Sequence, residues 1–144
     1  MISLYSGTPG SGKSLHLANR LYWKVKNNMP VICNFPIAIE KITKKPRDCF
    51  TYVTNEELTP KFLKEYAQKY WEEKGGRVKE DTILLVIDEC QMMFNSRDWG
   101  RGDRKEWLEF FTIHRHMGYE IQLCCQFDRM LDRQIRSSGK PLRA

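Results

Sequence analysis

The sequence predicts an α/β fold, with a mainly parallel sheet covered by helices on both faces in a three-layer sandwich. Three observations lead to this prediction. Short β-prone runs alternate with longer amphipathic segments, which favours parallel strands joined by right-handed crossovers. Residues 82–87 form a continuous apolar run rich in β-branched side chains, as in strands buried on both faces. A glycine-rich segment at residues 7–14 lies between the first β-prone run and the first amphipathic segment.

The first half of the chain contains three predicted strands and one helix. Residues 1–6 form the first strand, and apolar residues at near-helical spacing predict a helix over 13–28. A second strand is expected at 31–35, because β-branched residues there are followed by Pro36. Residues 41–48 are basic and contain proline, so they predict a surface segment before a short strand at 49–53.

The second half alternates in the same way. We expect a helix at 60–74, a strand at 82–87, a loop at 95–102, a helix at 103–117, a strand at 120–126 and a short helix at 129–136. Pro60 after Thr59 is typical of a helix start, and Asp103 with Glu106 matches a capping box. Gly118 is expected to end the second of these helices. The central strands are expected to lie side by side in the order 31–35, 82–87, 120–126 and 1–6.

The length of 144 residues fits one domain, and the composition limits its class. Lys and Arg number 24 against 18 Asp and Glu, so the formal net charge of +6 favours polyanionic partners or serves solubility alone. The longest aliphatic run is far too short to span a bilayer, and no signal peptide is expected. The five cysteines are odd in number and lack C-x-x-C spacing, which indicates reduced thiols. His114 and His116 would point to different faces of a helix, which argues against a zinc site.

Residues 7–14 match the phosphate-binding pattern G-x-x-x-x-G-K-[ST] at every position. Glycines allow the backbone N–H groups to turn inward around a triphosphate, and the helix that follows directs its positive end at the phosphates. Lys13 is expected to reach the β- and γ-phosphates, and Ser14 to offer its hydroxyl to Mg²⁺. The predicted nucleotide-binding residues are Gly7, Thr8, Pro9, Gly10, Ser11, Gly12, Lys13, Ser14 and Leu15.

Two acidic residues follow the strand at 82–87. Ligands bind at the carboxyl ends of strands in parallel sheets, so Asp88 and Glu89 should lie at the same sheet edge as the phosphate loop. We expect Asp88 to hold the Mg²⁺ shell and Glu89 to orient and polarise the attacking water. Gln126 ends the next strand, and its amide suits sensing of the γ-phosphate or of that water. The alternative is that these are ordinary polar residues at strand ends.

Four segments together resemble the N-terminal domain of the zonular occludens toxin family, the assembly ATPases of filamentous phages related to the FtsK/HerA pumping motors. They are the phosphate loop near the N-terminus, Val31-Ile-Cys-Asn34, Ile87-Asp-Glu-Cys90 and His114-Arg-His-Met-Gly-Tyr-Glu-Ile121. The phosphate loop is generic, whereas the histidine-containing segment is much more specific to the family. The resemblance extends over nearly the whole chain.

The resemblance implies an ATP- and Mg²⁺-dependent domain of a homo-oligomeric motor that extrudes or packages single-stranded phage DNA. Its expected location is the bacterial cytoplasm, at the inner face of the inner membrane, with other phage assembly proteins as partners. Full-length members continue into a membrane span and an extra-cytoplasmic tail, which this sequence lacks, so a truncated or short member is expected. A further strand would follow Arg136, and the chain is expected to end too soon for it.

Several arginines are candidates for contacts outside the chain's own phosphate site. Arg115 precedes the strand at 120–126, whose length of roughly 20 Å separates it from its own phosphates. It would therefore act at a subunit interface, unless it forms a structural salt bridge. Arg133 and Arg136 occupy a place from which related ring ATPases present an arginine to a neighbour's γ-phosphate.

The loop and helix start at residues 95–104 combine arginines with an aromatic residue. Arg97, Trp99, Arg101 and Arg104 are candidates to grip single-stranded DNA by charge and stacking. A solvated loop is the alternative interpretation.

Two rival functions remain open. A nucleotide or small-molecule kinase would need the same phosphate loop, but the acidic pair and Gln126 favour water activation over transfer to an acceptor. A nucleotide-gated docking module with negligible hydrolysis is the non-enzyme alternative. A GTPase switch is disfavoured because no Asn-Lys-x-Asp motif is present.

Overall fold

The computed structural model describes residues 1–6, 13–41, 49–94, 101–125 and 140–143. Within these ranges, six strands form one sheet in the order β3-β2-β4-β5-β1-β6, and every neighbouring pair is parallel. The strands are β1 Ile2–Ser6, β2 Val31–Cys33, β3 Phe50–Tyr52, β4 Ile83–Ile87, β5 Tyr119–Cys125 and β6 Lys140–Arg143. The helices are α1 Lys13–Lys26, α2 Pro60–Glu73 and α3 Arg101–Ile113, with short 3-10 turns η1 Ile39–Lys41, η2 Cys90–Met92 and η3 His114–Met117.

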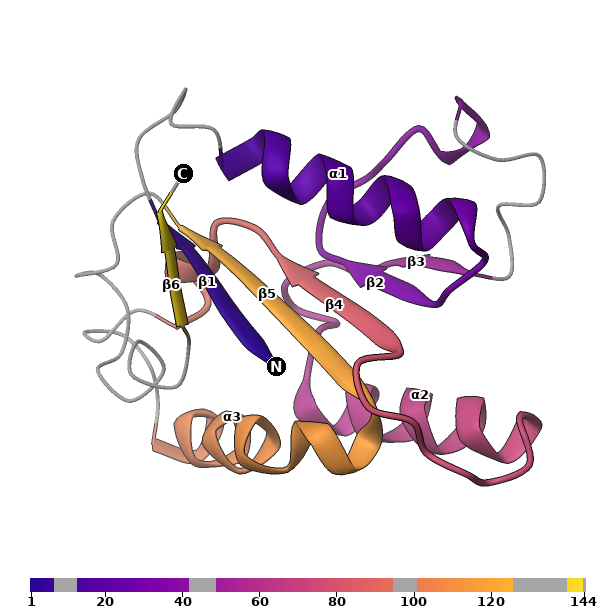
Figure 1. Ribbon diagram of the computed structural model, residues 1–144. Coiled ribbons are helices and arrows are strands. Elements are labelled where there is room, and N and C mark those ends of the chain that lie inside the picture. Colours follow the sequence, from indigo (N-terminus) through magenta and orange to yellow (C-terminus); the bar gives the residue numbers. More distant parts are fainter. Residues whose placement is uncertain (7–12, 42–48, 95–100, 126–139, 144) are drawn as a thin grey trace.

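The layers match the predicted sandwich. Helix α1 covers one face of the sheet, and α2 and α3 cover the other (Figure 1). The central order β2-β4-β5-β1 is the expected one, and the short strand expected at 49–53 is present as β3. The predicted α/β fold class is therefore confirmed.

Each face of the sheet has its own apolar core, because side chains alternate along a strand. Ile83, Leu85 and Ile87 of β4 pack against the α2 and α3 side. Leu84 and Val86, on the opposite face, pack in a second cluster with residues of α1. All five side chains of β4 are inaccessible to solvent, as the continuous apolar run predicts. Strand β4 therefore forms a rigid support for the residues that follow it.

Helix α2 begins and ends where the sequence predicts. The Thr59 hydroxyl accepts a hydrogen bond from Phe62 N at 3.1 Å, and Pro60 occupies the first turn. The apolar face of the helix packs on the sheet, with Leu63, Ala67 and Trp71 buried. The helix ends before Gly75, whose positive φ closes it.

The structure corrects the predicted start of the third helix. Helix α3 begins at Arg101, so Asp103 lies inside its first turn and does not cap it. The local capping pattern was misleading because acidic residues also favour the first helical turn, where they face the positive end of the helix dipole. The predicted stop at Gly118 is confirmed, although the last turn before it, η3, is a 3-10 helix.

A second correction concerns the end of the chain. We expected the chain to stop before a further strand could form, but β6 is present and pairs in parallel with β1 from Ser3 to Ser6. Four residues suffice, because β6 is an edge strand that pairs with β1 on one side only. The helix predicted at 129–136 lies outside the described residues, as do residues 95–100 of the predicted loop and residues 42–48 of the basic segment.

Candidate nucleotide-binding site

The two strands that precede the predicted phosphate loop and acidic pair, β1 and β4, end at the same edge of the sheet. Strand β1 ends at Ser6 and α1 begins at Lys13, so the two elements on either side of the phosphate loop are present as predicted. Strand β4, which precedes Asp88, is separated from β1 only by β5. Two strand spacings correspond to about 10 Å, which an Mg²⁺–triphosphate group can bridge. The acidic pair therefore follows β4 at the same sheet edge at which β1, the strand before the phosphate loop, ends.

Several predicted site residues lie outside the described part of the chain. They are the loop residues 7–12, the catalytic candidates Gln126, Arg133 and Arg136, and the DNA-contact candidates Arg97 and Trp99. Lys13, Ser14 and Leu15 form the first turn of α1. Arg101 and Arg104 lie in the first turn of α3 and not in a loop.

Asp88 is held at the end of β4 by a side chain from the carboxyl end of β2. Asn34 Oδ1 accepts a hydrogen bond from Asp88 N at 2.8 Å, and Asn34 Nδ2 donates to Asp88 O at 3.0 Å. The same amide also donates to Asn55 Oδ1 at 2.8 Å. The Asn34 side chain thus continues the β2–β4 pairing beyond the last residue of β2. From the sequence, Asn34 was only a point of family resemblance, and this role was not predicted.

The Asp88 carboxylate is half-buried, and its surroundings suit a cation. Its Oδ1 accepts from Glu89 N at 2.9 Å. Burial raises the pKa of the neighbouring Cys33 thiol, and the Asp88 charge raises it further, so this thiol is neutral. One carboxylate together with a serine hydroxyl fits Mg²⁺, which takes few protein ligands and completes its shell with phosphate oxygens and water. The described residues contain no cluster of three or more His, Cys, Asp or Glu side chains that could hold a metal by themselves.

Glu89 has an unusual backbone conformation. Its φ of 49° and ψ of 44° place it in the left-handed region, which is uncommon for a residue with a side chain. Its side chain is exposed, and its Oε2 accepts a hydrogen bond from Gln91 Nε2. Strain of this kind concentrates at functional sites, where surrounding contacts hold it in place. Neither the strain nor the contact with Gln91 was predicted, because no local sequence pattern signals either one.

The segment resembling the phage family contains one buried and one exposed histidine. His114 is buried and its Nδ1 lies 2.6 Å from Phe111 O, so the ring donates a hydrogen bond there. Burial lowers the pKa of His114, although the Phe111 contact opposes the shift, so the ring is neutral near pH 7. His116 and Arg115 are exposed in η3, which precedes the amino end of β5. Arg115 therefore lies at the sheet edge opposite to Asp88.

Glu120, in the same segment, forms a structural ion pair. Its carboxylate is buried in β5 and accepts hydrogen bonds from Arg20 of α1, one of them from Nε at 2.8 Å. Gln122 Nε2 also donates to Glu120 at 3.0 Å. A buried carboxylate requires such partners, so this pair fixes α1 on the sheet. The pair was not predicted from the sequence.

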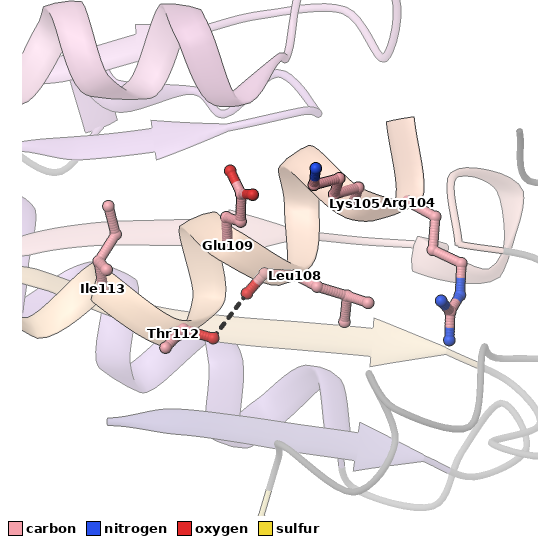
Figure 2. Close-up of a pocket in the computed structure, with 6 residues that line it drawn as sticks. All are labelled: Arg104, Lys105, Leu108, Glu109, Thr112 and Ile113. Carbon is pink, nitrogen blue, oxygen red and sulfur yellow. Dashed lines mark hydrogen bonds between the residues drawn. The ribbon is translucent and has the colours of Figure 1, made fainter. Parts of the chain in front are cut away.

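A groove runs along the outer side of α3, with a volume of about 610 Å³ (Figure 2). The described residues that line it are Arg104, Lys105, Leu108, Glu109, Thr112 and Ile113. The Thr112 hydroxyl donates a hydrogen bond to Leu108 O at 2.8 Å. Among these described lining residues, Arg104 is the one predicted contact residue, and no predicted phosphate or metal ligand is among them. None of the described helices has the length and apolar character needed to cross a membrane.

Comparison with known proteins gives relatives of two kinds. The Gene 1 protein of Escherichia phage If1 is 26% identical over 141 residues, and that of Enterobacteria phage fd is 27% identical over 139 residues. These matches cover 94% and 92% of this chain, and the chain spans 38% of the length of each relative.

Among solved structures, the DNA-packaging ATPase from Sulfolobus Turreted Icosahedral Virus matches with a TM-score of 0.66 and 19% identity, covering 96% of this chain and 71% of that one. The N-terminal domain of zonular occludens toxin from Neisseria meningitidis matches with a TM-score of 0.52 and 23% identity, covering 96% and 72%. At such identities these likenesses establish the fold alone. The family model described as zonular occludens toxin (Zot) matches residues 1–139, and the chain therefore belongs to this family.

Proposed function

We propose that this domain binds and hydrolyses ATP with Mg²⁺ and is the ATPase of a phage assembly motor that handles single-stranded DNA. The observation that carries the proposal is that β1 and β4, the strands that precede the two motifs, end at the same sheet edge. The phosphate-loop sequence links β1 to α1, and Asp88-Glu89 follows β4, two strands away. A cradle for a triphosphate and a carboxylate for its metal are the parts that phosphoryl transfer to water requires.

Each residue then has a distinct role. The backbone of residues 7–14 surrounds the phosphates, Lys13 neutralises the charge that develops on the γ-phosphate, and Ser14 with Asp88 holds Mg²⁺. Magnesium supplies Lewis-acid polarisation of the phosphoryl oxygens when it is bound. Glu89 orients the attacking water and accepts its proton. Gln126 is proposed to sense the γ-phosphate.

The relatives support the biological setting. One solved structure of this fold is a DNA-packaging ATPase, and another is the conjugation coupling protein TcpA with ATPgS. The sequence relatives are phage Gene 1 proteins. We therefore propose a homo-oligomer at the inner face of the bacterial inner membrane, working with other phage assembly proteins. A trans-acting Arg133 or Arg136, and DNA contact by Arg97, Trp99, Arg101 and Arg104, remain predictions.

Nucleotide binding is tested by Lys13→Ala. Loss of the lysine charge should weaken ATP binding by about 100-fold or more, equal to at least about 2.7 kcal/mol, because the charge-assisted contacts to two phosphates disappear. Isothermal titration with ATP and Mg²⁺ measures this loss. Lys61→Ala, which removes an exposed lysine from α2, is the matched control and should bind ATP normally.

A hydrolysis assay addresses the non-enzyme alternative. Turnover by the wild type with and without a single-stranded oligonucleotide separates a DNA-linked ATPase from a docking module, which would bind ATP without hydrolysing it. Unchanged ATP affinity in Lys13→Ala would contradict the assignment of the phosphate site.

A further inference from the structure

The side chain of Gln91 is a buried amide beside the candidate catalytic carboxylate. Gln91 lies in η2 and is only 8% exposed. Cys90, the preceding residue, and Phe94, three residues further on, are fully buried in the core between the sheet and the α2–α3 layer. Turn η2 also contacts β5, whose carboxyl end lies between those of β4 and β1. Gln91 is thus a buried polar side chain at the edge of the proposed site.

The hydrogen bond to Glu89 determines how the Gln91 amide is turned. A carboxylate only accepts, so Gln91 must direct Nε2–H toward Glu89 Oε2. The amide oxygen Oε1 is then buried, and it has no hydrogen-bond partner among the described residues. A buried acceptor without a partner is unfavourable for folding, and native structures rarely keep one without a reason. A contribution to folding stability therefore does not explain why a glutamine occupies position 91.

Contacts on three sides fix Glu89. Its backbone N donates to Asp88 Oδ1 at 2.9 Å, and its carbonyl accepts from Met92 N at 2.9 Å. These two bonds hold the left-handed backbone, and Gln91 holds the side chain. Gln91 donates to Oε2 alone, so this contact does not use the second carboxylate oxygen, Oε1. Without Gln91, an exposed glutamate side chain would sample several rotamers.

We propose that Gln91 is a positioning residue for catalysis: it holds Glu89 Oε2 so that Oε1 faces the attacking water. The inference rests on the proposed function, in which Glu89 is the base. Gln91 exchanges no proton and touches no substrate. Its contribution is to restrict Glu89 to one rotamer, which lowers the entropy lost on reaching the transition state.

The first test is Gln91→Leu in the full chain, which keeps the volume and removes the donor. We expect kcat for ATP hydrolysis to fall about 10- to 100-fold, by analogy with the loss of groups that orient metal ligands. The dissociation constant for ATP should stay within about twofold, because Gln91 does not contact the phosphates. The melting temperature should stay equal or rise, because the orphaned amide oxygen is removed. A merely structural glutamine would instead lower the melting temperature and leave kcat unchanged.

The second test uses charge. Gln91→Glu places two carboxylates side by side, and like charges at hydrogen-bond distance resist joint ionisation. The acidic limb of the kcat–pH profile should therefore move to higher pH by about one unit. Met92→Leu is the matched control, since Met92 lies next to Gln91 in η2 but is 73% exposed. Its kcat and pH profile should equal those of the wild type.

The outcomes separate this inference from the proposed function. If Glu89→Gln abolishes turnover and Gln91→Leu keeps wild-type kcat, Gln91 does not position Glu89 and only the inference fails. An increase of kcat in Gln91→Leu also overturns it, since Gln91 would then restrain Glu89. If Glu89→Gln itself retains full turnover, the assignment of Glu89 fails, and with it the proposed mechanism.

Discussion

Asn34 satisfies both backbone polar groups of Asp88 with one side-chain amide. The two bonds replace a backbone ladder where β2 has already ended, at Cys33. They keep the Asp88 peptide in line with β4, so the carboxylate leaves the strand in a fixed direction. Asn55 supports the amide with a third bond from the turn after β3.

Asn34→Leu tests whether these two hydrogen bonds hold Asp88 in place. The variant leaves the N–H and C=O of Asp88 without their partners, so the free energy of unfolding should fall by about 1–3 kcal/mol, measured by urea denaturation. Turnover should fall as well, because Asp88 loses its fixed position. Asn55→Ala is the control, because it removes only an exposed bond and should cost about 0.5 kcal/mol or less. If the free energy of unfolding falls equally in the two variants, Asn34 does not hold Asp88 in place.

Among the secondary-structure elements, the turn after η3 determines how β5 enters the sheet. Gly118 has a φ of 79°, and a Cβ at this position would lie 2.5 Å from Trp71 Cζ2 and 2.9 Å from Lys79 O. The tryptophan is held in place by its Nε1, which donates to Met117 O at 2.8 Å. Gly118 O in turn accepts from Thr82 N and Ile83 N, each at 2.9 Å. This glycine therefore joins η3, α2 and the start of β4.

Gly118→Ala should destabilise the fold strongly. The left-handed conformation costs an alanine about 1–2 kcal/mol, and the contact with backbone oxygen adds to that cost. Gly75→Ala is a matched control, since Gly75 has a φ of 91° but a Cβ there would have no atom within 4 Å. Urea midpoints of both variants separate the steric cost from the backbone cost. A loss in Gly118→Ala no greater than in Gly75→Ala would contradict the close packing.

The elements differ in how well the sequence predicts them. Strand β4 and helix α2 were predicted because burial, periodicity and capping agree locally over their whole length. The predicted start of α3 was wrong, because an acidic residue in the first helical turn resembles a capping residue. The prediction that the chain ends before a further strand was also wrong, because an edge strand forms through pairing with its neighbour, which the local sequence does not show. The roles of Asn34 and Gln91 could not be predicted either. They arise from contacts between chain segments and from one left-handed residue, Glu89, for which the local sequence carries no signal.

Across the entire domain, the two edges of the sheet carry different residues. The carboxyl edge carries Asp88 and Glu89, and the amino edge carries Arg115 and the exposed His116. Strand β5, seven residues long, separates them by roughly 20 Å. A contact made by Arg115 is therefore remote from the chain's own site. If Arg115 acts in catalysis, it acts through a second subunit, as predicted for this position.

Glu89 is assigned to turnover and not to nucleotide binding, and the proposed ATPase mechanism depends on this assignment. Measurements of ATP affinity and steady-state hydrolysis on Glu89→Gln provide its decisive test. The amide can still accept the hydrogen bond from Gln91, so the local structure and the dissociation constant for ATP should persist, within about twofold. Removal of the base should lower kcat by about 100-fold or more. Full turnover in Glu89→Gln, or loss of ATP binding together with turnover, would contradict the assignment.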